Sequence, residues 1–271
     1  MHYLCPLCAA PLVLTERTWG CSQQHKFDVA KEGYVNLLPV QKKNSKDPGD
    51  NKQMMFARRE FLTAGYYQGL SDRVNELALK FAPEAKQILD IGCGEGYYSQ
   101  RLFDVLNQHH QCELQGIDIS KSAIKYAAKR YPHLQFCVAS AYEMPIAAQS
   151  VDLAIRIYAP SKIEELHRIM ANGGVLITVS PGPLHHLALK KQIYAEPRLH
   201  AESTTHILGF ECLHQERLQS QLKLIHREHI AHFLEMTPYA WKFTDVQKQL
   251  LASQGLNCEL DFQIEVHRIS R

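Results

Sequence analysis

The sequence lacks long apolar runs and carries little excess charge. None of its apolar stretches approaches the roughly twenty residues that a helix needs to cross a bilayer. Residues 1–5 have neither the basic segment nor the long apolar segment of a secretory signal. The formal net charge of +2 excludes a strongly basic chain, although a local basic face could still bind a nucleic acid. We therefore expect a cytoplasmic protein with no membrane partner.

The cysteines do not indicate the disulfide framework of a secreted protein. Of the eight, four lie in or beside apolar, strand-like runs, where reduced thiols pack as small apolar side chains. With 271 residues, 45% hydrophobic and 21% charged, the chain can bury a substantial core, and its length predicts one large domain with accessory parts. The four cysteines in or beside apolar runs are Cys93, Cys112, Cys137 and Cys258.

Three cysteines and one histidine near the N-terminus have the spacing of a zinc site. Two residues separate Cys5 from Cys8, twelve follow, and three separate Cys21 from His25. Zinc prefers four thiolate or imidazole ligands, and a two-residue gap lets a tight turn present both sulfurs to one ion. Because all four ligand positions are filled, we expect a structural Zn2+. The ion would stabilise a segment of about forty residues, which is too short to build an adequate core alone. The alternatives are a chance cluster of buried cysteines and a redox-active Cys-x-x-Cys pair.

Residues 1–38 are predicted to form this zinc module. We expect Trp19, Phe27 and Tyr34 to pack around its metal-binding turns. Residues 41–52 are polar, basic at their start and interrupted by a Pro-Gly pair, as is typical of a linker or a mobile loop. This segment is either a solvated connector or an arm that contacts phosphates.

The middle of the chain alternates short apolar runs with segments of helical periodicity. Two helices are expected before the first strand, at residues 54–62 and 70–81. The alternation that follows is typical of a doubly wound parallel sheet in an α/β protein. Strands are expected at residues 87–91, 113–117, 134–139, 151–157 and 174–180, with helices at 97–106, 121–130 and 162–170.

The last third of the chain is less regular. A helical segment is expected at residues 246–254. Polar and apolar residues alternate over 260–266, which predicts an antiparallel strand at an edge of the sheet.

A glycine-rich turn joins the first expected strand to the next helix. Gly92, Gly94 and Gly96 follow an apolar strand that ends in Asp90. Glycine permits positive φ and lets a ligand approach the backbone, although a glycine loop by itself can be only a turn. The spacing G-x-G-x-G is tighter than the G-x-G-x-x-G of dinucleotide-binding folds. With the acid at the strand end, the turn resembles the first motif of Rossmann-like methyltransferases, which bind S-adenosylmethionine.

Other candidate binding residues follow the carboxyl ends of the strands, where open α/β sheets bind ligands. Asp118 ends the second strand and could accept both ribose hydroxyls, or it could cap the next helix beside Ser120. Asp90 could hold the methionine ammonium through a water. Residues 140–142 would border the adenine. Residues 156–160, which include an arginine and a tyrosine, would face a target base, unless the tyrosine belongs to the core.

Ten short motifs together resemble the RlmA (RrmA) family, bacterial methyltransferases that act on N1 of a guanine in a hairpin of 23S ribosomal RNA. The likeness runs from Cys5 to about Trp241. The motifs are C-P-L-C, C-x3-H-x-F-D, A-K-E-G-Y-V-N-L-L-P-V, D-P-G-D, L-D-I-G-C-G-E-G-Y-Y, A-A-K-R-Y-P, F-C-V-A-S, R-I-Y-A-P, P-G-P and M-T-P.

The resemblance implies a zinc-bearing RNA-recognition domain, an S-adenosylmethionine domain and a homodimer with an RNA-binding cleft. By position, it implies that Cys5, Cys8, Cys21 and His25 are the zinc ligands. It also implies that the cofactor contacts include Tyr67, Glu95, Gly96 and His185.

The expected organisation has three parts. Residues 1–38 form the RNA-recognition module, residues 39–84 are a linker with helices, and residues 85–271 form the methyltransferase domain with C-terminal elements on the substrate side. We expect the module and nearby basic residues to select RNA by phosphate contacts and hairpin shape. These basic residues are Lys42, Lys43, Lys46, Arg58 and Arg59.

The expected chemistry leaves one catalytic role open. The methyl group of the sulfonium is already activated, so the enzyme mainly has to place a nucleophile in line with it. Guanine N1 carries a proton and lies on the Watson–Crick edge, so the base must leave its pair and lose that proton. An aspartate or a histidine near the strand ends could accept it, and the sequence does not identify which.

Two other functions remain as hypotheses. The chain could be a small-molecule methyltransferase with a purely structural zinc module, since many such cores act on metabolites. It could also be a non-enzymatic zinc-finger protein that binds nucleic acid. Against the second stand Asp90, the glycine loop and Asp118, which are all intact.

Overall fold

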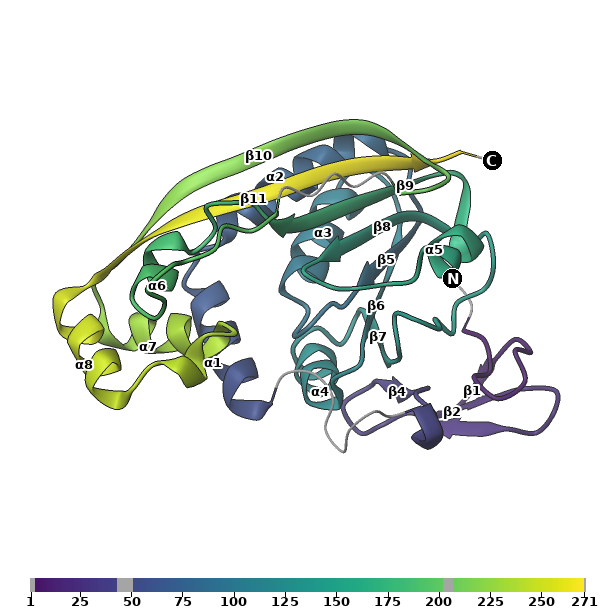
Figure 1. Ribbon diagram of the computed structural model, residues 1–271. Coiled ribbons are helices and arrows are strands. Elements are labelled where there is room, and N and C mark those ends of the chain that lie inside the picture. The colour runs from purple at the N-terminus through teal and green to yellow at the C-terminus, as the bar shows by residue number, and fades with distance from the viewer. Residues whose placement is uncertain (1–2, 43–50, 202–206, 271) are drawn as a thin grey trace.

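The computed structural model describes residues 3–42, 51–201 and 207–270. An eight-stranded sheet carries the larger part, and a three-stranded antiparallel sheet forms the N-terminal module. In Figure 1 the small module (purple) lies beside α4 and β4 at one end of the molecule, and α6, α7 and α8 lie at the other. Among the described residues, every helix falls short of the length and apolar character of a membrane span.

The centre of the large sheet is the predicted doubly wound parallel sheet. Its full strand order is β10-β11-β9-β8-β5-β6-β7-β4, and all neighbours from β9 to β4 run parallel. After β5 the polypeptide forms β6 and β7 on one side of β5, and then β8 and β9 on the other side. The strand order therefore reverses at β5. The bounds are β5 (Gln87–Ile91), β6 (Glu113–Asp118), β7 (Gln135–Val138), β8 (Val151–Ile157) and β9 (Met170–Pro181), which confirms the expected strands to within a few residues.

The expected helices are also confirmed. They bury apolar faces; α2, for example, buries Leu70, Val74 and Leu77 at helical spacing. Asn51 caps α1 by accepting a 2.9 Å hydrogen bond from the Met54 amide. The helices are α1 (Lys52–Thr63), α2 (Gln68–Phe81), α3 (Tyr97–Asn107), α4 (Lys121–Arg130), α5 (Ile163–Ile169) and α8 (Asp245–Gln254).

The expected edge strand lies inside the sheet. It is the middle of β11 (Leu256–Ile269), which runs antiparallel between β9 and a strand that the sequence pattern did not reveal, β10 (Phe210–Leu224). The edge assignment was wrong because the alternating polar residues of β11 are not solvated. They are buried and hydrogen-bond among themselves and to β10 side chains, as in the contacts of Asp261 with Arg217 and of Gln263 with Glu265.

Between these two strands the chain forms a small helical cap at the end of the molecule opposite the zinc module (Figure 1). It consists of α7 (Arg227–Met236), the 3-10 turn η2 (Ala240–Lys242) and α8. A short helix, α6 (Leu187–Lys191), precedes β10 in the same region. The cap contacts α1, because Phe233 of α7 packs against Phe61 with ring centroids 5.2 Å apart.

The N-terminal module is a small ribbon of β1 (Val13–Thr15), β2 (Thr18–Gly20) and β3 (Lys26–Asp28). Trp19 packs edge-on against Tyr3, with ring centroids 5.2 Å apart, and Phe27 packs in the same cluster. Tyr34 was wrongly expected there. It lies in the core of the large sheet, because the next strand, β4 (Val35–Asn36), joins that sheet beside β7.

The chain between the ribbon and α1 is only partly described. Residues Val40–Lys42 form the 3-10 turn η1. Most of the expected linker, including Lys43 and Lys46, lies outside the described residues. The four cysteines expected in the core are all buried, free thiols.

Candidate functional site

A cavity of about 530 Å³ opens where the strand order of the sheet reverses. This is where doubly wound sheets bind ligands, and the volume suits a cofactor. All the predicted cofactor residues except Gly96 line it: Tyr67, Asp90, Gly92, Gly94, Glu95, Asp118 and His185. Gly96 lies behind the wall as the N-cap of α3, where an added Cβ would stand 3.0 Å from the Tyr131 ring.

The glycine loop has the backbone that its sequence predicts. Gly92, Gly94 and Gly96 all have positive φ. At Gly92 an added Cβ would lie 2.4 Å from the Cβ of Ala159, so only glycine lets the loop after β5 pack against the loop after β8. At Gly94 an added Cβ would meet no atom within 4 Å. The second glycine therefore borders open space beside the cavity.

Asp118 holds the glycine loop in place. Its Oδ2 accepts a 2.9 Å hydrogen bond from the Gly94 amide, and its Oδ1 accepts one of 2.7 Å from the Ser120 amide. The cap of α4 is Ser120, whose hydroxyl accepts from the Ala123 amide. Because each carboxylate oxygen has more than one lone pair, Asp118 retains acceptor capacity for a ribose diol.

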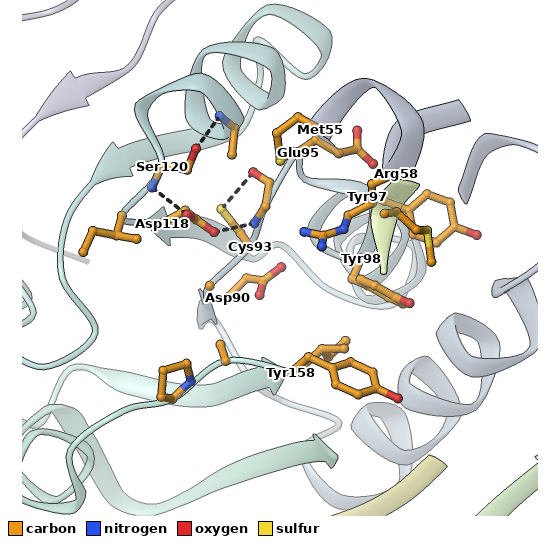
Figure 2. A pocket seen from close by; sticks show the side chains of 18 of the residues that line it. Met55, Arg58, Asp90, Cys93, Glu95, Tyr97, Tyr98, Asp118, Ser120 and Tyr158 are labelled. Atoms are coloured by element: carbon orange, nitrogen blue, oxygen red, sulfur yellow. Dashed lines mark hydrogen bonds between the residues drawn. The ribbon is translucent and has the colours of Figure 1, made fainter. Parts of the chain in front are cut away.

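Asp90 lies in the middle of the cavity wall, close to the glycine loop (Figure 2). It is buried, and the Ser99 hydroxyl donates a 2.6 Å hydrogen bond to its Oδ2. Burial raises its pKa to about 7, and the nearby Asp118 carboxylate adds to the rise. A cationic ligand would lower this pKa again and restore the carboxylate. The cavity therefore suits a ligand that brings positive charge to Asp90.

Glu95 supplies a second buried carboxyl group. Arg130 contacts its Oε2 at 3.2 Å, yet burial outweighs this ion pair and raises the pKa of Glu95 to about 7. Within the described part of the chain, its Oε1 is buried and has no hydrogen-bond partner. Such an acceptor in a cavity wall is ready to receive a donor from a ligand.

A group of histidines and tyrosines lines another part of the cavity. The Tyr67 hydroxyl lies 3.0 Å from Nε2 of His186, and the Tyr158 hydroxyl lies 3.2 Å from Nε2 of His185. The two histidine rings stack with centroids 3.8 Å apart. Burial lowers the pKa of His185 to about 3, and His200 adds to this effect. His185 is therefore neutral at physiological pH.

The segments expected to border the adenine and the target base line the cavity in part. Ser140, Ala141 and Tyr142 are in its wall, as are Tyr158 to Pro160. Arg156 is not among the lining residues, and its guanidinium donates a 2.8 Å hydrogen bond to the Ser161 hydroxyl.

Several lining residues were not predicted from the sequence. Tyr98 follows the glycine motif, His186 is adjacent to His185, and Thr237 belongs to the M-T-P motif, so a signal was present for these three. Met55 and His200 had none. Arg58, expected to contact RNA, also lines the cavity (Figure 2).

The four predicted zinc ligands come together in the ribbon. Their ligand atoms all lie within 4.8 Å of one another. The sulfurs of Cys8 and Cys21 are 3.7 Å apart, and His25 Nδ1 is 3.4 Å from the sulfurs of both Cys5 and Cys21. Tetrahedral zinc with bonds of about 2.3 Å to sulfur and 2.0 to 2.1 Å to nitrogen separates such atoms by about 3.8 and 3.6 Å. The four side chains therefore fit a closed, structural Zn2+ site.

The ribbon is attached to a loop that also borders the cavity. Tyr3 pairs with Ile146 in an antiparallel bridge, and the Leu4 amide donates a 2.9 Å hydrogen bond to the Pro145 carbonyl. The same loop begins with Ser140 to Tyr142 in the cavity wall. The zinc ribbon and the cavity thus share one loop, residues 140–148.

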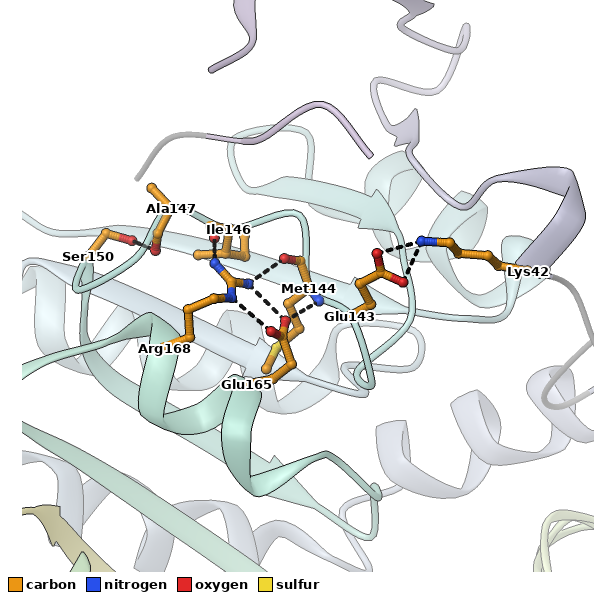
Figure 3. Close-up of polar contacts among 8 residues, drawn as sticks. All are labelled: Lys42, Glu143, Met144, Ile146, Ala147, Ser150, Glu165 and Arg168. Carbon is orange, nitrogen blue, oxygen red and sulfur yellow. Dashed lines mark hydrogen bonds and ion pairs between the residues drawn. The ribbon is translucent and has the colours of Figure 1, made fainter. Parts of the chain in front are cut away.

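An arginine of α5 fixes the shape of this loop (Figure 3). Arg168 donates hydrogen bonds to the carbonyls of Ile146 and Met144 at 2.6 and 2.7 Å. It also pairs with Glu165, which accepts a 2.6 Å hydrogen bond from the Met144 amide. Lys42 forms an exposed ion pair with Glu143 on the same loop.

Both parts of the chain are similar to known proteins. Residues 3–46 match a family described as "RlmA, N-terminal", and residues 83–235 match a methyltransferase domain. A 23S rRNA (guanine(748)-N(1))-methyltransferase of Streptomyces fradiae is 34% identical over 253 residues, which are 89% of this chain and 86% of that protein. YxjB of Bacillus subtilis (strain 168), provisionally named a 23S rRNA (guanine-N(1)-)-methyltransferase, is 30% identical over 88% of this chain and 86% of its own length.

Among solved structures, a protein of Bacillus halodurans C-125, provisionally described as a methyltransferase, has the same fold. Its TM-score is 0.50 at 13% identity, over 72% of this chain and 98% of that one. The methyltransferase domain, with its cavity at the strand ends, takes S-adenosylmethionine, and the ribbon takes zinc. The chain belongs to the RlmA family of methyltransferases.

Proposed function

We propose that the protein methylates N1 of one guanine in a hairpin of 23S ribosomal RNA, with S-adenosylmethionine as the methyl donor. The likeness to the Streptomyces fradiae enzyme over nearly the whole chain carries this proposal. That likeness covers 89% of this chain, and the zinc ribbon separately matches the family's N-terminal part over residues 3–46. A metabolite-specific enzyme would need the cavity and has no evident use for the ribbon.

The acids and the glycine loop are proposed to hold the cofactor. Gly94 leaves room for it beside the loop, and Asp118 accepts from its ribose. Asp90 and Glu95, two buried carboxyl groups with raised pKa values, face its cationic end. When bound, the cofactor supplies an activated methyl group. The protein then has to bring N1 into line with that methyl group and keep competing water out.

The target base is proposed to enter on the side of Tyr158. This residue follows β8, and Figure 2 shows it on the other side of Asp90 from Glu95. A guanine that reaches this wall must leave its pair in the hairpin, because N1 lies on the Watson–Crick edge.

We propose that the zinc ribbon contributes to RNA recognition. The ribbon is attached to the loop of residues 140–148, whose first three residues line the cavity, so an RNA bound to the ribbon would lie close to the site. We also propose that the protein is cytoplasmic and that it forms the homodimer that the resemblance to the family implies. Light scattering after size exclusion would measure its mass, and a monomer at all concentrations would contradict the dimer.

Primer extension tests the proposed function. N1 methylation blocks pairing and stops reverse transcriptase, so a deletion strain should lose one stop in 23S rRNA and complementation should restore it. The purified protein should create the same stop in unmodified rRNA when S-adenosylmethionine is added. An unchanged stop pattern in the deletion strain would refute the proposal, and transfer to a metabolite but not to RNA would favour a small-molecule enzyme.

A further inference from the structure

A directional chain of hydrogen bonds begins at the backbone of β11. The amide of Asp261 can only donate, and it donates to Nδ1 of His185 at 3.1 Å. An acceptor nitrogen carries no proton, so this hydrogen-bond network assigns the single ring proton of His185 to Nε2. An imidazolium would place two N–H groups face to face at Nδ1. The contact itself therefore selects the neutral Nε2–H form.

The next step of the chain reaches the cavity. Nε2 of His185 lies 3.2 Å from the Tyr158 hydroxyl, and because Nε2 carries the proton, the hydroxyl oxygen accepts. A hydroxyl that accepts here directs its own proton elsewhere. Among the residues that the structure describes, no acceptor is found for that proton, and the Tyr158 side chain lines the cavity. This chain of hydrogen bonds thus leaves the Tyr158 hydroxyl as an oriented O–H donor for a ligand.

The backbone at Tyr158 is strained in a way that supports a function. Its φ is +55°, in the left-handed region that a bulky aromatic residue rarely adopts. The Tyr158 amide donates a 3.0 Å hydrogen bond to the Val179 carbonyl, and the following Ala159 packs against Gly92. Neighbours on both sides therefore hold this conformation, and such strain gathers at binding and catalytic sites.

We propose that Tyr158 is a catalytic residue that donates a hydrogen bond to O6 of the target guanine, and that His185 is the positioning residue that orients its hydroxyl. This inference rests on the proposed function. As the N1–CH3 bond forms, the S–CH3 bond breaks with its electron pair kept by sulfur, and the N1 proton leaves to solvent. Loss of that proton spreads negative charge from N1 to O6. A preorganised donor at O6 stabilises this charge as it develops.

The test compares two hairpin RNAs, one with guanosine and one with 6-thioguanosine at the target position. Sulfur is a weak hydrogen-bond acceptor, so the second RNA gains little from the Tyr158 hydroxyl. In the full-length protein, Tyr158→Phe should lower kcat on guanosine about 100-fold, as loss of one such donor does elsewhere. KM for RNA and Kd for S-adenosylmethionine should stay within about twofold, and the loss on 6-thioguanosine should be under about threefold, if the hydroxyl acts only on the developing charge.

His185→Phe provides a second route to the same answer. His185→Phe should slow methylation of the guanosine RNA more than methylation of the 6-thioguanosine RNA. The double variant with Tyr158→Phe should be no slower than Tyr158→Phe alone, because the two residues act as one unit. Tyr194→Phe, at a tyrosine that does not line the cavity, should match wild type. Equal losses on both RNAs, or no loss, would overturn the inference. A wild-type protein that leaves both RNAs unmethylated would instead overturn the proposed function.

Discussion

Gly94, at the centre of the glycine loop, offers a substitution whose effects on folding and on binding can be separated. Its φ is +56°, and an added Cβ would meet no protein atom within 4 Å. Gly94→Ala should therefore cost the fold only the backbone strain of a left-handed alanine, because no atom has to move. The new methyl group, however, would occupy the open space through which we expect the cofactor to approach the loop.

The size of the folding effect follows from the backbone. A left-handed conformation costs an L-residue about 1 to 2 kcal/mol. For a chain of this size about 1 kcal/mol lowers Tm by roughly 2 to 4 °C, so we expect a fall of about 2 to 8 °C. Gly173 is a matched control. It lies in β9 outside the cavity, its φ is +73°, and an added Cβ would again meet nothing within 4 Å.

Two measurements decide the outcome. Thermal unfolding without ligand should show similar losses for Gly94→Ala and Gly173→Ala. Titration calorimetry with S-adenosylmethionine should show binding at least about tenfold weaker for Gly94→Ala, equivalent to about 1.4 kcal/mol. The control should bind as wild type does. If Gly94→Ala binds the cofactor as tightly as Gly173→Ala, the cofactor does not approach this loop.

Three other predictions test the zinc site, the shared loop and the buried acid. Cys5→Ser should abolish stoichiometric zinc, measured by mass spectrometry of the metal, and make the ribbon sensitive to protease while cofactor binding persists, because the ion stabilises only the ribbon. Arg168→Ala should cost about 2 kcal/mol in chemical denaturation, because it removes the donor of two loop carbonyls and the ion-pair partner of Glu165, whereas Lys42→Ala, which breaks an exposed ion pair, should cost at most about 0.5 kcal/mol. Because the pKa of Asp90 is raised to about 7, its contribution to stability is complete below the unfolded pKa near 4 and is lost as pH rises through 7. The Tm of ligand-free Asp90→Asn should therefore increase relative to wild type between pH 5 and pH 8.

Each of these has a result that contradicts it. Zinc retained at full stoichiometry in Cys5→Ser would remove Cys5 from the ligand set. Equal effects of Arg168→Ala and Lys42→Ala would mean that the partly buried contacts of Arg168 with the loop carbonyls stabilise the protein no more than the exposed Lys42–Glu143 pair does. A Tm difference between Asp90→Asn and wild type that is the same at both pH values would show that the carboxyl group titrates normally.

Patterns that are local in the sequence predicted much of the fold and of the site. The zinc ligands were identified from a spacing within 21 residues, and the glycine loop from a strand, a turn and a helix in succession. The parallel strands were also predicted well, because strands buried on both faces are continuous apolar runs. In each case the side chains that decide the structure are neighbours along the chain.

Contacts between distant segments could not be predicted in the same way. The polar alternation of β11 indicated a solvated edge, yet β10 pairs with its outer side and its polar residues find partners in the fold. Tyr34 lies in the large core because the adjacent strand β4 pairs with β7, a strand about one hundred residues later in the sequence. A pattern within one segment carries no information on which other segment will cover it.

The sequence by itself determined the metal, the cofactor loop and the alternation of parallel strands and helices from β5 to β9, since each depends on residue type and short spacing. Only the tertiary structure decided how these parts act together. It attached the zinc ribbon to the loop that borders the cavity, and it placed the Asp261 amide against His185, 76 residues away in the sequence. The direction of that hydrogen bond, and with it the orientation of the Tyr158 hydroxyl, exists only when three separate segments meet.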